Sequence, residues 1–418
     1  METNVHIEVL RQEKSTLPEG DLKALVIQEL KDAGGIVPSS IITFFKNETL
    51  KNHVEEIRVC EVFNSNIENE EIWGQSPRPL EDVNVHIYIY RLNSDDMQAE
   101  LITMEDGTEV TCAANHCLLP NLEFHTLWES LVYDTTVKHQ LLKCAETTML
   151  FSQKGVNPTI INWNKVVLLH GPPGSGKTSL CKALAQKLSI RLSHMYRYAE
   201  FMEINSHSLF SKYFSESGKL LAFKESFVCV LIDEVESLAR ARDAVLAGTE
   251  PSDAIRVVNA LLTQIDIMKR YPNVLILTTS NLSNSIDLAF VDRADLKIYI
   301  GPPEVSAIYK IYSSCLEELI RVKKSKPHWL IYTDAIKMLD GKTEDEISEC
   351  LRNSKHLLEV SKSSVGLSGR TLRKVPFLTH VKFIGSHIVT IEQFLNAMLK
   401  TVEECKEEIN CFVKKESC

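Results

Sequence analysis

The sequence lacks the features that would send a chain into a membrane or out of the cell. It contains no run of 18 apolar residues and no segment resembling a signal-peptide core, which a membrane span or a secretion signal requires. Its eleven cysteines show no paired zinc-type spacing. Cys112 and Cys117, with His116 between them, come closest, but no second ligand pair follows. We therefore expect a soluble protein in a reducing compartment, with ordinary thiols at both positions.

A surplus of basic residues is also missing. The chain has 46 Lys and Arg against 56 Asp and Glu, a formal net charge of -10. Proteins that bind nucleic acid need a basic surface for the phosphates, so the balance argues against direct nucleic-acid binding, while leaving room for a local basic patch. The length of 418 residues suits two to three domains. The hydrophobic content of 44% is ordinary for a globular protein.

What the sequence does contain is a glycine-rich loop behind the apolar run Val166–Leu169. The loop fits the pattern G-x-x-x-x-G-K-[ST], in which backbone N–H groups wrap a polyphosphate. A helix predicted from Lys177 to Leu188 would point its positive end at the anion. The alternative is a chance match in a glycine-rich turn. The predicted ATP-binding residues are Gly171, Pro172, Pro173, Gly174, Ser175, Gly176, Lys177, Thr178 and Ser179.

A second candidate site follows the apolar run Phe227–Ile232, which ends in Asp233 and Glu234. Parallel strands end at one edge of a sheet, so both carboxylates should lie beside the phosphate loop. We expect Asp233 and Thr178 to hold Mg²⁺ and Glu234 to polarise the attacking water. A solvated strand end would be the default without the loop.

Two further residues suit phosphate chemistry. Asn281 ends the predicted strand that begins with the apolar run Val274–Leu277. Its amide could orient the attacking water, although an ordinary strand cap would look the same. Arg293 precedes the last predicted strand and could reach the γ-phosphate of a neighbouring subunit. The alternative is a surface pair with Asp292 or Asp295, which would contribute little.

Beyond residue 303 the strand signals end and helical ones dominate, so we expect a separate helical domain. Within it, Ser368 and Gly369 mark a helix start, and Arg370 could reach back over the nucleotide. A capped helix with an exposed arginine is the alternative.

The pattern in the N-terminal third of the sequence predicts a separate α+β domain. Residues 83–90 alternate as a half-buried strand, Asp21–Asp32 should form a helix, and Val59–Phe63 a possible strand. The acidic stretch Asn93–Gly107 should be an irregular hinge. We expect Val132 and Tyr133, after it, to line the adenine pocket.

In this order, the loop, the strand ending in two carboxylates, the asparagine and the two arginines resemble an AAA+ ATPase. The fuller pattern is similar to the pachytene checkpoint (thyroid receptor-interacting) AAA+ ATPase family. It includes residues 203–208, 211–218 and 248–253 and the segment Gly366-Leu-Ser-Gly-Arg370. The resemblance is dense from about residue 120 to 380 and weaker over residues 1–110.

The resemblance implies a P-loop AAA+ parallel-sheet domain (108–303), a helical lid (304–418) and an N-terminal α+β recognition domain with its hinge (1–107). It implies an ATP- and Mg²⁺-dependent homohexamer that remodels HORMA-domain proteins with a HORMA-domain adaptor. It further implies that the protein acts in meiotic recombination, chromosome synapsis and the spindle assembly checkpoint. The implied locations are the nucleus, chromosomes and the cytoplasm.

Tyr213 and Phe214 fall where such ATPases place a pore loop that grips polypeptide; packing under the sheet is the alternative. Two departures stand out. Leu296 occupies the place of a second arginine found in many relatives. Only eight residues, Lys219 to Ser226, separate Gly218 from the strand that leads to Asp233. Eight residues make about two helical turns, where relatives have a longer helix.

A non-hydrolysing scaffold or receptor-binding cofactor is the alternative function that these residues leave open. The shortened segment favours it. Intact Lys177, Asp233, Glu234 and Arg293 favour turnover. A DNA-dependent motor would fit the fold but not the acidic balance.

Overall fold

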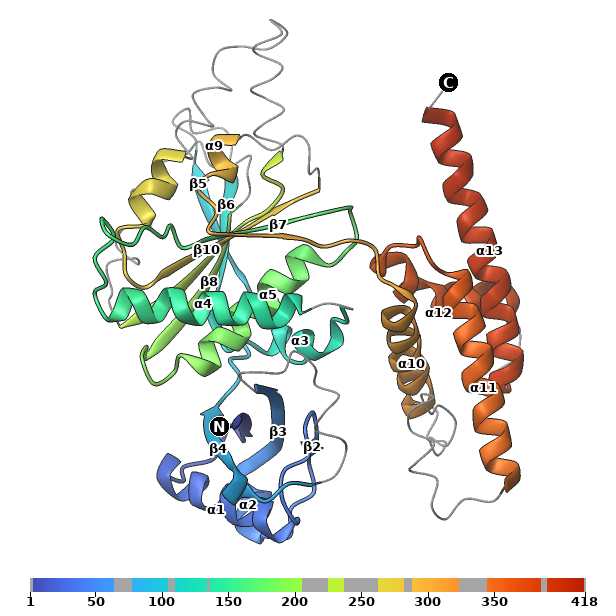
Figure 1. Cartoon of the computed structure of the whole chain (residues 1–418), viewed down its shortest axis with the longest axis horizontal. Helices are drawn as coiled ribbons and strands as arrows, with labels where there is room; N and C mark the ends of the chain where they lie inside the picture. The colour runs from blue at the N-terminus through green and yellow to red at the C-terminus, as the bar shows by residue number, and fades with distance from the viewer. Residues whose placement is uncertain are drawn as a thin grey trace, which may run out of the picture.

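The chain is described by a computed structural model over residues 3–63, 77–103, 110–133, 136–204, 225–236, 262–281, 288–322, 344–384 and 389–416. These residues form two β-sheets and a bundle of helices set to one side (Figure 1). None of the helices in these ranges combines the length and the apolar character of a membrane-spanning segment.

The larger sheet carries the predicted phosphate loop. Its strand order is β11-β7-β10-β9-β8-β6-β5, and the first five of these strands run parallel. The predicted α/β fold with a parallel sheet is therefore confirmed. The strands are β5 Gln98–Thr103, β6 Val110–Leu119, β7 Val166–His170, β8 Tyr198–Ile204, β9 Ser226–Ile232, β10 Val274–Ser280 and β11 Leu296–Tyr299.

Two antiparallel strands extend this sheet beyond β8. β6 pairs with β8, and β5 pairs with β6. The prediction of an irregular hinge over 93–107 is therefore wrong for Gln98–Thr103. An edge strand buries at most one face, so apolar and polar residues alternate along it. It therefore lacks the continuous apolar run that marks the central strands.

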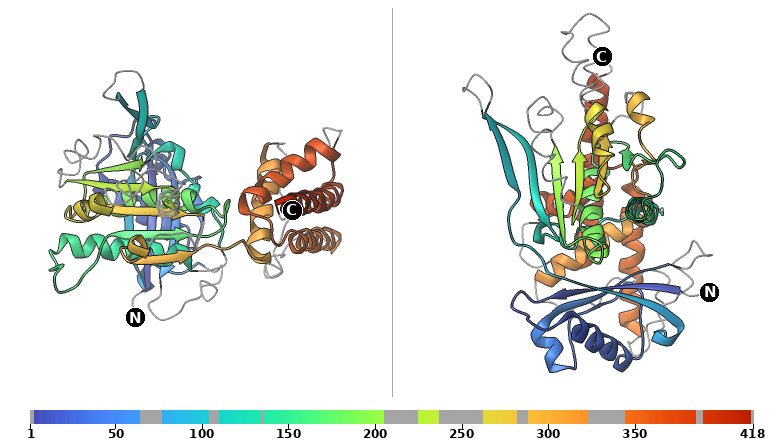
Figure 2. Two further views of the ribbon diagram at one scale, coloured as in Figure 1. Left: turned by 90° about the horizontal axis from the view of Figure 1, so that it is seen from above. Right: turned by 90° about the vertical axis from the view of Figure 1, so that its left-hand side faces the viewer.

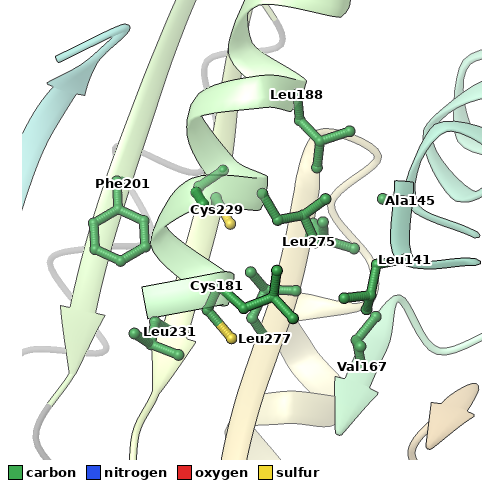
Figure 3. Close-up of a cluster of buried hydrophobic side chains, with 14 of the residues drawn as sticks. Leu141, Ala145, Val167, Cys181, Leu188, Phe201, Cys229, Leu231, Leu275 and Leu277 are labelled. Carbon is green, nitrogen blue, oxygen red and sulfur yellow. The ribbon is translucent and has the colours of Figure 1, made fainter. Parts of the chain in front are cut away.

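Successive residues of each central strand face opposite layers of helix. Val167 of β7 packs toward α4 (Val137–Gln153) and α5 (Lys177–Arg191), together with Leu275, Leu277 and Leu231 (Figure 3). Val166 and Leu168 face the other side, where Ile265 and Phe290 pack. Because both faces of these strands are buried, their sequences are nearly continuous apolar runs.

The N-terminal residues form a second sheet of order β2-β3-β1-β4. Its strands are β1 Thr3–Arg11, β2 Ile41–Ile42, β3 Val54–Phe63 and β4 Val83–Tyr90. β1 runs parallel to β4 and antiparallel to β3. The helices α1 (Glu19–Asp32) and α2 (Glu48–His53) share a core with this sheet. The α+β character predicted for this part of the chain is thus confirmed.

The carboxyl end of α5 is buried against the N-terminal sheet. Lys187 Nζ lies 2.8 Å from Glu8 Oε2 of β1, and both side chains are less than 5% exposed. Ile190 packs on Leu10 and Tyr90. The helix that starts at the phosphate loop therefore ends inside the contact with the N-terminal domain, as the side view shows (Figure 2).

The C-terminal part is a helical bundle, as predicted. It contains α10 Val305–Val322, α11 Glu344–Ser363, α12 Gly369–Phe383 and α13 Ile391–Glu416. Tyr312, Leu357, Leu372, Leu395 and Met398 are among its buried core residues. The bundle follows directly on the sheet strand β11 through residues 300–304.

Candidate nucleotide site at the carboxyl edge of the parallel sheet

The glycine-rich loop connects β7 to α5, as the motif predicts. Gly171, Gly174 and Gly176 have φ angles of 148°, 75° and 89°, a region that side chains with a Cβ rarely adopt. Gly176 precedes the first residue of α5, so the free N–H groups of that helix face the loop. Such an arrangement binds phosphate groups.

Two buried polar groups of the loop suit an anion. Lys177 is 5% exposed, and its Nζ donates to the carbonyl oxygens of Gly171 and Pro172, each at 2.9 Å. The Ser175 Oγ is buried with no hydrogen-bond partner. Burial lowers the pKa of Lys177, and Arg370 acts in the same direction, while nearby carboxylates oppose the change. A phosphate would stabilise the charged lysine, so the loop fits a nucleotide.

The first carboxylate after β9 meets the loop. Thr178 Oγ1 donates to Asp233 at 3.0 Å, and Thr279 of β10 donates to the same carboxylate. Hydroxyl and carboxylate oxygens are the ligands that Mg²⁺ prefers. Within the described residues, no group of three or more His, Cys, Asp or Glu could hold a metal by itself. Thr178 and Asp233 therefore suit Mg²⁺ that also binds phosphate and water.

The second carboxylate occupies an unusual backbone position. Glu234 has φ 54°, in the left-handed region that costs a non-glycine residue about 1–2 kcal/mol. Its N–H donates to Thr279 Oγ1 at 3.2 Å, and Asn281 Nδ2 donates to Glu234 Oε1 at 3.3 Å. The structure thus brings Asn281 beside Glu234. Thr279, near the end of β10, therefore holds the backbone of Glu234, and Asn281, which follows β10, holds its side chain.

The lid helix α12 begins against the phosphate loop. Ser368 caps it by accepting a hydrogen bond from the Thr371 N–H, and the Arg370 N–H donates to the Gly174 carbonyl at 3.1 Å. A Cβ on Gly174 would lie 2.9 Å from the Ser368 Oγ. The capped helix of the alternative interpretation is present and Arg370 is exposed, yet its charge is close enough to affect the pKa of Lys177.

Arg293 forms a bidentate ion pair within the chain. Its Nε and Nη2 donate to the two oxygens of Asp266, at 3.2 and 2.9 Å, and its Nη1 donates to the Ala289 carbonyl. The partner is neither Asp292 nor Asp295, the two that the sequence offered as alternatives. Asp295 instead accepts the backbone N–H groups of Asn164 and Lys165.

Val132 and Tyr133 lie where the ATPase sheet and the lid meet. Val132 packs against the lid core and Tyr133 against the sheet core. The Tyr133 hydroxyl donates to the Gly176 carbonyl at 3.4 Å, and burial raises its pKa above the ordinary value. Tyr133 therefore lies beside the start of α5, and the place of both residues in an adenine pocket stays a prediction.

Tyr213 and Phe214 lie outside the described residues, as does most of the shortened segment from Lys219 onward. Three other residues contribute contacts that the sequence did not predict: Thr279, Asp266 and the buried Glu236, whose Oε1 accepts the Asn281 N–H at 3.0 Å. The Asp-Glu-Val-Glu run after β9 is the one signal that could have pointed to Glu236.

Comparison with known proteins adds the family. Family models match residues 1–95 (TRIP13 N-terminal domain), 167–302 (ATPase family associated with various cellular activities) and 304–406 (TRIP13-like, AAA+ ATPase lid C-terminal domain). The Rattus norvegicus pachytene checkpoint protein 2 homolog is 48% identical, covering 97% of this chain and 94% of the relative. The Homo sapiens homolog is 49% identical with the same coverage.

Solved structures agree. Caenorhabditis elegans PCH-2 superposes with a TM-score of 0.71 at 32% identity, covering 97% of this chain and 99% of that one. A chain of an Escherichia coli HORMA:CdnC:Trip13 complex matches with a TM-score of 0.50 at 15% identity, covering 68% and 94%, which shows the fold alone. With its loop, carboxylates and lid arranged as described, this nucleotide-binding AAA+ ATPase belongs to the pachytene checkpoint protein 2 (TRIP13) family.

Proposed function

We propose that this chain is an ATP-driven homohexameric motor that remodels HORMA-domain proteins. The observation that carries the proposal is that the phosphate loop and the ends of β9 and β10 meet at one sheet edge. There Thr178 of the loop binds Asp233, and Asn281 binds Glu234. The HORMA-domain substrate is supported by family membership and by the bacterial Trip13 relative, which was solved together with a HORMA protein.

In the proposed reaction, a water oxygen forms a bond to the γ-phosphorus and the bond to the β–γ bridging oxygen breaks. Glu234 accepts the proton of the attacking water, and Asn281 holds the Glu234 carboxylate in place. Lys177 neutralises charge on the phosphates. Mg²⁺, held by Thr178 and Asp233, supplies further charge neutralisation when bound. Arg293 of one subunit reaches the γ-phosphate of its neighbour, and Arg370 senses the nucleotide within its own subunit.

Meiotic recombination, chromosome synapsis and the spindle assembly checkpoint are the proposed settings, in the nucleus, on chromosomes and in the cytoplasm. The support is the family alone. Tyr213 and Phe214 would grip the substrate in a central pore, and the N-terminal domain would receive the substrate with its HORMA-domain adaptor.

Glu234→Gln tests the proposal. It keeps the shape of the side chain but removes the base, so steady-state ATP turnover should fall by at least ~10²-fold while ATP affinity is retained. The measurement is phosphate release with and without a HORMA-domain protein and its adaptor. Wild-type turnover in this variant would sink the catalytic assignment. A wild-type chain that binds ATP without turnover would favour the scaffold.

A further inference from the structure

The ends of β9 and β10 are joined through one hydroxyl group. The strand ladder between them runs as far as the pair Thr278–Ile232, and Asp233 and Glu234 follow. There the Thr279 Oγ1 donates to the Asp233 carboxylate and accepts the Glu234 N–H at 3.2 Å. The Val235 N–H donates to the Thr279 carbonyl at 3.0 Å. Three consecutive residues after β9 are therefore held by one residue of β10.

The direction of these hydrogen bonds is fixed by chemistry. A backbone N–H can only donate, so the Thr279 hydroxyl oxygen accepts from Glu234 and its proton is left for Asp233. Asp233 then accepts hydrogen bonds from two hydroxyls, those of Thr178 and Thr279. Thr279 is 1% exposed, so water cannot readily replace these contacts.

The backbone at Glu234 needs such support. Its φ of 54° is a conformation that glutamate leaves unless surrounding contacts hold it. The Thr279 hydroxyl binds the N–H of this residue, while Asn281 binds the end of its side chain. Loss of the hydroxyl would let the turn relax and carry the carboxylate with it.

We propose that Thr279 is a positioning residue, which sets the Mg²⁺-binding carboxylate of Asp233 and the base Glu234 relative to each other. The inference rests on the proposed catalytic role of Glu234. Proton transfer requires the base to lie within hydrogen-bond reach of the attacking water, and an error of about 1 Å in position costs on the order of 10²-fold in rate.

Thr279→Val tests this, since valine matches the shape of threonine without the hydroxyl. The turnover number should fall by roughly 10- to 10²-fold, with little change in ATP affinity and with a higher Mg²⁺ concentration needed for half-maximal rate. Thr279→Ser restores the hydroxyl and should recover most of the turnover. The nucleotide affinity and the Mg²⁺ titration are measured on the full chain.

Thr278 offers a matched control on the same strand. It is also fully buried, but its hydroxyl donates to the Val167 carbonyl at 2.9 Å, away from the two carboxylates. Thr278→Val should lower the melting temperature about as much as Thr279→Val does, yet leave the turnover number and the Mg²⁺ requirement unchanged. Equal losses of turnover in the two valine variants would overturn the proposal.

Glu234→Gln, measured in parallel, separates the inference from the function on which it rests. If this variant is inactive while folded Thr279→Val turns over at the wild-type rate, the positioning role is wrong and the base assignment stands. If Glu234→Gln is active, both fall. Should Thr279→Val fail to fold, Thr279→Ala compared with Thr279→Ser gives the same contrast in turnover and Mg²⁺ requirement.

Discussion

At the scale of single residues, Arg293 is paired with an acidic residue of the same chain. Its fork-like pair with Asp266 lowers the pKa of that aspartate, first through the hydrogen bonds themselves. A planar guanidinium held on two prongs has few alternative orientations. Asp266 therefore fixes the orientation of the Arg293 guanidinium.

Arg293→Ala should reduce turnover by roughly 10³-fold or more if the arginine acts as a finger, with ATP binding retained. Mixing these subunits with Glu234→Gln subunits should restore part of the activity, since some interfaces then combine an intact finger with an intact base. Phosphate release from mixtures of defined ratio measures this.

Arg321→Ala is the control, because Arg321 makes a similar pair with Glu318 on an exposed face of α10. It should have no effect on turnover. A dilute monomer with full ATPase activity would contradict a finger supplied by the neighbouring subunit.

The sequence alone could predict the loop, Asp233, Glu234 and Asn281, because each belongs to a contiguous motif at the end of an apolar run. Thr279 and Asp266 could not be predicted in the same way. Their roles arise from contacts with residues 46 and 27 positions away, which no local pattern records.

At the scale of elements, the start of α12 and the phosphate loop approach each other without room for a side chain. Gly174→Ala should therefore displace the Ser368 cap from the loop in addition to straining a left-handed backbone. ATP affinity should fall by about tenfold or more, equivalent to roughly 1.4 kcal/mol. Titration with a fluorescent nucleotide measures it.

Gly366→Ala separates strain from contact. Gly366 also has a left-handed backbone, with φ 95°, but a Cβ added there would meet no heavy atom within 4 Å. This variant should lose about 1–2 kcal/mol of stability and keep its ATP affinity. If both alanine variants bind ATP equally well, the docking of α12 on the loop does not contribute to nucleotide binding.

The parallel strands were also predictable as elements, since burial on both faces leaves an apolar run in the sequence. β5 and β6 were not. The adjacent polar residues Asn115 and His116 interrupt the apolar pattern of β6, and its residues pair with residues of β8 that lie 80 to 90 positions further along the chain. Its place in the sheet is decided by that distant partner.

At the scale of the whole molecule, ion pairs connect the N-terminal domain with helices of the ATPase domain. Arg58 of β3 lies 2.7 Å from Glu129 of α3 (Leu127–Ser130), which is 3.5 Å from Lys187. Burial alone would raise the pKa of Glu129, but Lys187 and Arg58 outweigh it and lower the pKa to about 2, from 4.5.

A depressed carboxyl pKa stabilises the fold above the unfolded value and is lost on acidification. The Glu129 contribution should therefore be complete above about pH 4.5 and disappear as the pH falls toward about 2. In chemical unfolding across this range, Glu129→Gln should lower neutral-pH stability and flatten the acid dependence. Glu123→Gln, which removes an exposed carboxylate nearby, controls for net charge; an unchanged profile in Glu129→Gln would contradict the prediction.

The buried ion pair of Lys187 and Glu8 restricts which substitutions can be tolerated at these two positions during evolution. Replacing Lys187 leaves the buried Glu8 carboxylate without its ion-pair partner, at a cost of about 3–5 kcal/mol, whereas replacing both with apolar residues of similar volume is often neutral. A descendant therefore cannot readily change one position first. We expect these positions, 179 residues apart, to vary together among relatives, so that the N-terminal domain and the ATPase evolve as one inherited unit.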